Sequence, residues 1–213
     1  MKAYIFDLDG TLLDSMHVWE QIDVDFLSGR GIDVPPDYID VICSKSFPEA
    51  AAYTIERFGL PDGVDDLLRE WNRMAEHAYG HTVRLKPYAK EFLVTLKERG
   101  AKLGIATSLP EALYEPALKN NGIRGFFDVI CSTDEVSHGK TRPDVFLFAA
   151  RKLGVDPVDC VVFEDIPQAI ESAKKAGMTV YGVYDESSSE HWEWIKKIAD
   201  GVVYDFEEAI AEL

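Results

Sequence analysis

Between residues 16 and 80, hydrophobic positions recur three and four residues apart, as they do along one face of a helix. This spacing predicts four amphipathic helices and no strand. Prolines stand where two of these helices begin, and Gly59 follows the end of the third, which is typical of helix boundaries. The expected helices cover residues 16–28, 36–42, 48–58 and 64–79. This part of the chain is therefore expected to be entirely helical.

The rest of the chain alternates between short apolar runs and amphipathic helices. Glycines follow several of the helices, as expected at helix ends. Strand–helix alternation predicts a parallel sheet with helices on both faces. The run at 3–6 belongs to this sheet, so the helical segment interrupts an α/β domain just after its first strand. The expected strands are 3–6, 102–106, 128–131, 160–163 and 178–183.

Composition narrows the class of protein. With 213 residues, 46% of them hydrophobic, the chain is expected to form a packed core. A net charge of −16 repels phosphate backbones, so we expect no nucleic-acid partner. No apolar run approaches the ~20 residues that cross a bilayer, and no signal-peptide pattern is present. We therefore expect a soluble, cytoplasmic protein without membrane contact, and a monomer.

Polar side chains gather where the predicted strands end. The carboxyl ends of parallel strands meet at one rim of a sheet, where ligands bind. Two acids follow the first strand, two hydroxyls follow the strand at 102–106, and two acids close the strand at 160–163. A lysine lies in the segment after the strand at 128–131. These residues are Asp7, Asp9, Thr107, Ser108, Lys140, Glu164 and Asp165.

The chemistry of this rim indicates phosphoryl transfer. Several carboxylates do not crowd together ionised unless a cation neutralises them, and a set of oxygen ligands suits Mg²⁺. Hydroxyls and a lysine favour an anion instead of a cation, because they offer hydrogen-bond donors and positive charge. A hard cation beside donors for a phosphate is the arrangement of a phosphoryl-transfer site. A carboxylate can itself be the nucleophile of such a reaction.

These residues also carry a resemblance to a known family. The stretch DLDGTL at 7–12, Thr107, Lys140 and the pair Glu164-Asp165 match, in order, the four motifs of the haloacid dehalogenase-like (HAD) hydrolase superfamily. The helical segment resembles the α-helical cap of that superfamily. The resemblance implies an α/β fold in which a Rossmann-like parallel sheet core, residues 1–14 and 84–213, carries an inserted four-helix cap at 15–83.

The resemblance also implies roles for the catalytic residues. Asp7 would attack phosphorus, and Asp9 would protonate the leaving oxygen and later activate water. Thr107 and Lys140 would hold the transferring phosphoryl group. An acid at position 9 suits the departure of an alcohol, which needs a proton, so it favours phosphate esters over carbon–halogen or carbon–phosphorus bonds.

The implied metal site is a Mg²⁺ site. Its ligands would be Asp7, the backbone carbonyl of Asp9, Asp165, and Glu164 directly or through water. The family often continues this motif with a serine and a glycine, whereas here Ile166-Pro167 follows. This departure can change the affinity for the metal without abolishing binding.

Four further residues are predicted to contact the substrate. Ser108 follows Thr107, and His17 lies where the chain crosses into the helical segment. Lys45 and Phe47 lie at the expected tip of the cap. There, β-phosphoglucomutase-like relatives often carry an arginine that holds a second phosphate, and a lysine lacks its bidentate fork.

The favoured function is therefore a Mg²⁺-dependent phosphatase of small phosphorylated metabolites, acting through an aspartyl-phosphate. Two alternatives stay open: a β-phosphoglucomutase-like sugar-phosphate mutase, and a non-catalytic phospho-acceptor or binding protein. Three other features are interpreted structurally. Trp19 and Trp71 are expected to pack within the cap, residues 185–194 to form a solvated loop and helix start, and Asp144 to begin a helix and help orient Lys140.

Overall fold

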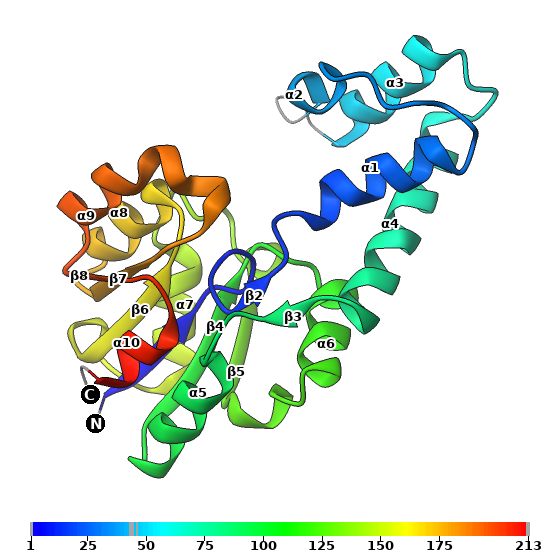
Figure 1. The fold of residues 1–213 in the computed structure, drawn as a ribbon. Helices are drawn as coiled ribbons and strands as arrows, with labels where there is room; N and C mark the ends of the chain where they lie inside the picture. Colours follow the sequence, from blue (N-terminus) through cyan, green and yellow to red (C-terminus); the bar gives the residue numbers. More distant parts are fainter. Residues whose placement is uncertain (1, 43–44, 46, 212–213) are drawn as a thin grey trace. The chain divides into compact units, whose positions relative to one another are not determined.

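The protein divides into two compact units in this computed structural model, which describes residues 2–42, 45 and 47–211. One unit combines the chain up to Met16 with the chain from Val83 onward, and the other is His17–Thr82. Figure 1 shows the first as a sheet with helices and the second as helices alone. Among the described residues, no helix is long and apolar enough to cross a membrane.

The first unit is built on six parallel strands, which confirms the predicted Rossmann-like α/β core (Figure 1). The first strand is central, because Phe6 is in register with Ile105 on one side and Phe163 on the other. The last strand was not predicted, since three residues are too few to show a period. In sheet order the strands are β5 (Val129–Ser132), β4 (Lys102–Thr107), β1 (Ala3–Phe6), β6 (Cys160–Glu164), β7 (Thr179–Val183) and β8 (Gly201–Val203).

Both faces of the sheet are buried. Successive side chains of a strand point to opposite faces, so neighbouring residues of β1 pack into different clusters. Ile5 belongs to a buried cluster with residues of α7, α8 and α9. Phe6 stacks on Phe163 at 5.2 Å between ring centroids and packs against Phe92 of α5 and Phe206 of α10. The helices of this unit are α5 (Ala89–Glu98), α6 (Glu111–Asn120), α7 (Asp144–Leu153), α8 (Pro167–Lys175), α9 (Trp192–Ile198) and α10 (Phe206–Ala211). Short 3-10 turns occupy η1 (Arg124–Phe126), η2 (Thr133–Glu135), η3 (Pro157–Asp159) and η4 (Glu186–His191).

The second unit contains the four predicted helices. Its core combines apolar packing with a buried polar pair, since the hydroxyls of Tyr38 and Thr54 lie 2.7 Å apart. Trp71 is buried against Phe26 and Phe47, as its helical spacing predicted. The helices are α1 (Val18–Ser28), α2 (Tyr38–Ile42), α3 (Phe47–Phe58) and α4 (Val64–His81).

A short ladder joins the two segments that flank the helical unit. Strand β2 (Leu13–Asp14) pairs antiparallel with β3 (Arg84–Leu85), and the Lys86 N–H donates to the Leu12 carbonyl at 2.9 Å. The two-residue strands are too short to be seen as a pattern in the sequence. The pairing brings the start and the end of the insertion together in the first unit.

A buried ion pair corrects one prediction. Asp185 and Ser188 are buried, so the start of the segment at 185–194 is not a solvated loop. Lys86 donates from Nζ to the Tyr184 carbonyl at 2.6 Å and lies 2.7 Å from Asp185 Oδ2. Burial by itself would raise the pKa of Asp185, but hydrogen bonds from Lys86 and Ser187 outweigh it and lower that pKa.

Replacing Lys86 by methionine should destabilise the protein by about 3–5 kcal/mol, because it leaves Asp185 buried without its cation. Urea denaturation measures this loss. The control is Lys97→Met, which removes the exposed pair with Asp128 and should cost less than about 1 kcal/mol. Equal losses for the two variants would contradict a structural role for the buried pair.

The same pair should make stability sensitive to acid. A carboxyl whose pKa is lowered by folding stabilises the protein above its unfolded pKa, about 4, and this contribution is lost as the pH falls through the folded value. The unfolding free energies of wild type and Asp185→Asn should therefore differ fully at pH 6, and the difference should shrink progressively as the pH falls below about 4. A difference independent of pH would contradict this prediction.

Candidate active site

The nucleophile candidate, Asp7, continues the first strand by one residue. Its N–H donates to the Phe163 carbonyl at 3.1 Å, which extends the pairing of β1 with β6. The Asp7 residue is only 4% exposed. Because both strands end at the same rim, Asp7 comes to lie beside the acids that close β6.

The chain turns back on itself immediately after Asp7. The N–H groups of Thr11 and Leu13 both donate to the Leu8 carbonyl, at 3.2 and 2.8 Å. Gly10 has a φ of +74°, and a Cβ atom there would lie 2.4 Å from Asp165 Oδ2. Only glycine combines this backbone conformation with room for the neighbouring carboxylate.

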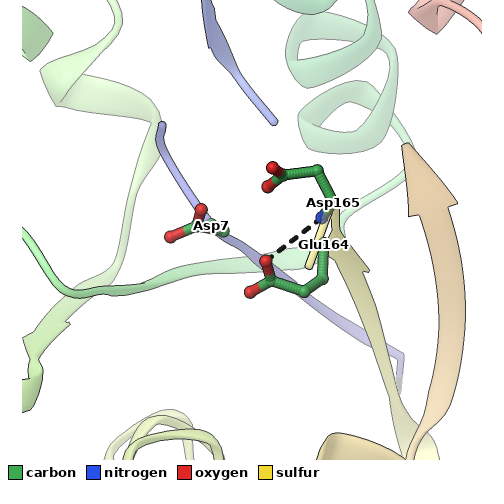
Figure 2. A group of neighbouring side chains, drawn as sticks. All are labelled: Asp7, Glu164 and Asp165. Carbon is green, nitrogen blue, oxygen red and sulfur yellow. Dashed lines mark hydrogen bonds between the residues drawn. The ribbon is translucent and has the colours of Figure 1, made fainter. Parts of the chain in front are cut away.

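Three buried carboxylates converge at this rim, as Figure 2 shows. One oxygen from each of Asp7, Glu164 and Asp165 can be chosen so that all three lie within 4.8 Å of one another. The hydroxyl of Thr11 donates to Asp165 Oδ1 at 2.9 Å. The Glu164 side chain folds back on its own backbone, where Oε1 accepts the N–H groups of Asp165 at 3.1 Å and Ile166 at 3.2 Å.

Lys140 is the cation that contacts this cluster in the described part of the chain. Its Nζ forms an ion pair with Asp7 Oδ1 and donates to Glu164 Oε2 at 2.8 Å. The lysine side chain is 9% exposed, and that of Glu164 is fully buried. Glu164 thus holds Lys140 with one oxygen and the turn after β6 with the other.

Burial and like charge shape the acidity of the site. Burial raises the pKa of Asp7 to about 8, with Glu164 and Asp9 adding to the rise and Lys140 opposing it. The pKa of Asp165 is also raised, first by burial and then by Glu164 and Asp7. Burial alone would lower the pKa of Lys140, but its two carboxylate partners outweigh this and raise it.

The cluster fits a small, hard cation. Three buried carboxylates share one ammonium group, so a further positive charge is needed for all of them to be ionised together. Every candidate ligand is an oxygen, which is the preference of Mg²⁺. Asp7, Glu164 and Asp165 are therefore the residues that could hold a metal ion.

The remaining predicted residues of this unit lie along the same rim or next to it. Thr107 ends β4, the neighbour of β1, and its buried hydroxyl accepts the Leu109 N–H at 3.1 Å. Ser108 is exposed. Asp9 is half-buried, and its Oδ1 accepts the Ser15 hydroxyl at 2.5 Å.

Two hydroxyls of the site were not predicted. Thr11 holds Asp165, and Ser15 holds Asp9. In the sequence, both hydroxyls are indicated by their position in the stretch that also carries Asp7. The expectation that Asp144 helps orient Lys140 is not met: His138 Nδ1 lies 2.9 Å from Asp144 Oδ1, and the ion-pair partners of Lys140 are the site carboxylates.

The predicted substrate contacts His17, Lys45 and Phe47 belong to the helical unit. Phe47 packs against Trp19 with ring centroids 5.3 Å apart, and the Nζ of Lys45 lies 5.1 Å from the centre of the Tyr53 ring. Ser44 and Ser46, the sequence neighbours of Lys45, lie outside the described residues.

Comparison with known proteins gives a consistent picture of the family. A family model described as haloacid dehalogenase-like hydrolase matches residues 4–183. The phosphorylated carbohydrates phosphatase of Thermotoga maritima is 28% identical over 184 residues, which cover 86% of this chain and 85% of that protein. The validoxylamine A 7'-phosphate phosphatase of Streptomyces hygroscopicus subsp. limoneus is 31% identical over 182 residues, with 85% of each chain covered.

Solved structures agree with the fold. A candidate β-phosphoglucomutase from Thermotoga maritima superposes with a TM-score of 0.84 at 26% identity, covering 95% of this chain and 94% of that one. The family model spans most of the chain, and the two relatives named above are phosphatases. The chain therefore belongs to the haloacid dehalogenase-like hydrolase family, as a phosphomonoester hydrolase.

Proposed function

We propose that the protein is a Mg²⁺-dependent phosphatase of small phosphorylated metabolites that works through phosphorylated Asp7. The observation that carries the proposal is the buried cluster of Asp7, Glu164 and Asp165 with Lys140 paired to Asp7. Relatives named as phosphatases of phosphorylated carbohydrates and of hexitols support the substrate class.

The metal would be held by Asp7 and Asp165, with the backbone carbonyl of Asp9 and with Glu164. When bound, the ion supplies positive charge that neutralises the crowded carboxylates and attracts the oxygens of the phosphate. Glu164 already accepts hydrogen bonds from Lys140 and from two backbone N–H groups. It would therefore contact the metal with a remaining lone pair or through a water molecule.

In the first step, a carboxylate oxygen of Asp7 attacks phosphorus. The new O–P bond forms as the bond between phosphorus and the leaving oxygen breaks. Asp9, as the carboxylic acid, gives its proton to that oxygen, so that an alcohol departs. Lys140 and the hydroxyl of Thr107 donate hydrogen bonds to the phosphoryl oxygens as their charge is redistributed.

In the second step, Asp9 is the carboxylate and removes a proton from a water molecule. The water oxygen attacks phosphorus, the bond to Asp7 breaks, and inorganic phosphate leaves while Asp7 returns to its carboxylate form. The hydroxyl of Ser15 holds the Asp9 side chain through this cycle.

The helical segment, residues 15–83, is proposed to act as a cap on a core formed by 1–14 and 84–213. It would exclude bulk water and contact the leaving group. Ser108, His17, Lys45 and Phe47 are proposed substrate contacts on the grounds of their positions in the sequence. A cytoplasmic location and a monomeric state stay predictions.

Phosphate release from a panel of sugar phosphates, nucleotides and phospho-acids tests the reaction. Release should need Mg²⁺, stop with EDTA, and fall by at least about 10³-fold in Asp7→Asn, which lacks the nucleophile but keeps its size. The matched control is Asp159→Asn, an exposed acid of η3 that should leave the rate unchanged. No release from any compound, or isomer formation instead, would contradict a phosphatase.

Thermal denaturation with and without Mg²⁺ tests the metal site separately. At 100 times its dissociation constant, Mg²⁺ should stabilise the wild type by about 2.7 kcal/mol. Asp165→Asn should lose this stabilisation, yet unfold at a higher temperature than wild type in EDTA because one of the crowded charges is gone. Undiminished stabilisation of the variant by Mg²⁺ would count against Asp165 as a ligand.

A further inference from the structure

Two histidines lie side by side near the end of α4, in the helical unit. His77 and His81 are four residues apart, a spacing that places side chains next to each other on one face of a helix. Their ring centroids are 4.7 Å apart, and the ring planes are inclined by 42°. Both residues are exposed to solvent. The pair is therefore accessible, and a single helix fixes its spacing.

Hydrophobic packing does not explain this pair. Each histidine follows a buried residue of α4 by two positions, which is about 200° around the helix. The two imidazoles therefore project from the side of α4 opposite its buried face. That face is formed by Leu67, Trp71, Ala75 and Tyr79.

The ring nitrogens of the pair have no polar partner in the part of the chain that the structure describes. Neither His77 nor His81 forms a hydrogen bond or an ion pair there. His191 differs in this respect, because its Nε2 lies 3.4 Å from Glu190 Oε1. Two imidazoles held side by side in this way can offer two nitrogen lone pairs to one ligand.

A metal ion is the ligand that two such nitrogens fit. Two histidines at positions i and i+4 of a helix can bind one Zn²⁺ ion, as in the zinc-binding helices of metalloproteases. Imidazole nitrogen suits Zn²⁺, whereas Mg²⁺ and Ca²⁺ prefer oxygen ligands. Because the d electrons of Zn²⁺ impose no geometry, water molecules can complete its coordination around two fixed imidazoles. The net charge of −16 attracts cations to the protein.

The sequence around the pair gives the ion a structural effect. Gly80 lies between the histidines, one residue before the helix ends at His81. A glycine inside a helix weakens it relative to alanine. The last turn closes with the Thr82 N–H donating to the Ala78 carbonyl at 2.8 Å. An ion that binds both His77 and His81 spans this turn and holds it in the helical conformation.

We propose that His77 and His81 bind one Zn²⁺ ion, at a site separate from the carboxylate cluster of Asp7, Glu164 and Asp165. The two sites differ in chemistry, because the pair on α4 offers nitrogen ligands and the cluster offers only oxygen. The nitrogen site therefore selects Zn²⁺ over Mg²⁺. Its occupancy stabilises the last turn of α4 and does not depend on the phosphatase reaction.

Calorimetric titration of the protein with zinc chloride, in excess Mg²⁺, tests the ligands. Wild type should show a saturable Zn²⁺ site that Mg²⁺ does not displace. His77→Gln and His81→Gln should each weaken binding at this site by about 100-fold, because the second ligand of a chelate binds intramolecularly. The matched control is His191→Gln, which replaces a histidine of η4 and should bind Zn²⁺ like wild type. No saturable Zn²⁺ binding, or equal binding by wild type and both α4 variants, would overturn the proposal.

Two further readouts locate the ion. With Cu²⁺ as the probe, electron paramagnetic resonance should show coupling to two imidazole nitrogens in wild type and to fewer in either α4 variant. A spectrum without nitrogen coupling, or one that both variants leave unchanged, would refute the site. Hydrogen exchange at the amides of His81 and Thr82 should slow when Zn²⁺ is added to wild type and stay unchanged in His77→Gln. Equal exchange rates in wild type with and without bound Zn²⁺ would contradict the effect on the last turn of α4.

Discussion

The crowding of three buried carboxylates around one lysine is the constraint on which the rest of the structure depends. Burying Asp7, Glu164 and Asp165 together is costly, and Lys140 offsets only part of the repulsion. Such an arrangement persists only where the surrounding fold holds it. Here the acids lie at the ends of two adjacent central strands, which makes the sheet the frame of the site.

Local details of the rim serve the same constraint. Gly10 leaves room for the carboxylate of Asp165, and the hydroxyl of Thr11 binds that carboxylate. Glu164 accepts the backbone of its own turn while holding Lys140. The backbone and side chains around the cluster are therefore organised before any substrate arrives, which is what electrostatic catalysis requires.

Three buried acids illustrate how a partner decides the role of a charge. Asp185 is paired with Lys86, and its lowered pKa marks a group that stabilises the fold. Asp165 accepts a hydrogen bond from a hydroxyl and has a raised pKa, which is expected of a carboxylate whose ionised form needs a cation nearby. Asp23 has neither kind of partner in the described residues, and burial raises its pKa to about 7.

The sequence by itself determined the elements and the ends of the strands where the chemistry gathers. Periodicity is local, so the four helices of the insertion, five of the six parallel strands and the acids after β1 and β6 could all be predicted. Only the tertiary structure decided which distant groups meet. The β2–β3 pairing and the Lys86–Asp185 ion pair depend on residues far apart in the chain, whose contacts leave no periodic trace in the sequence.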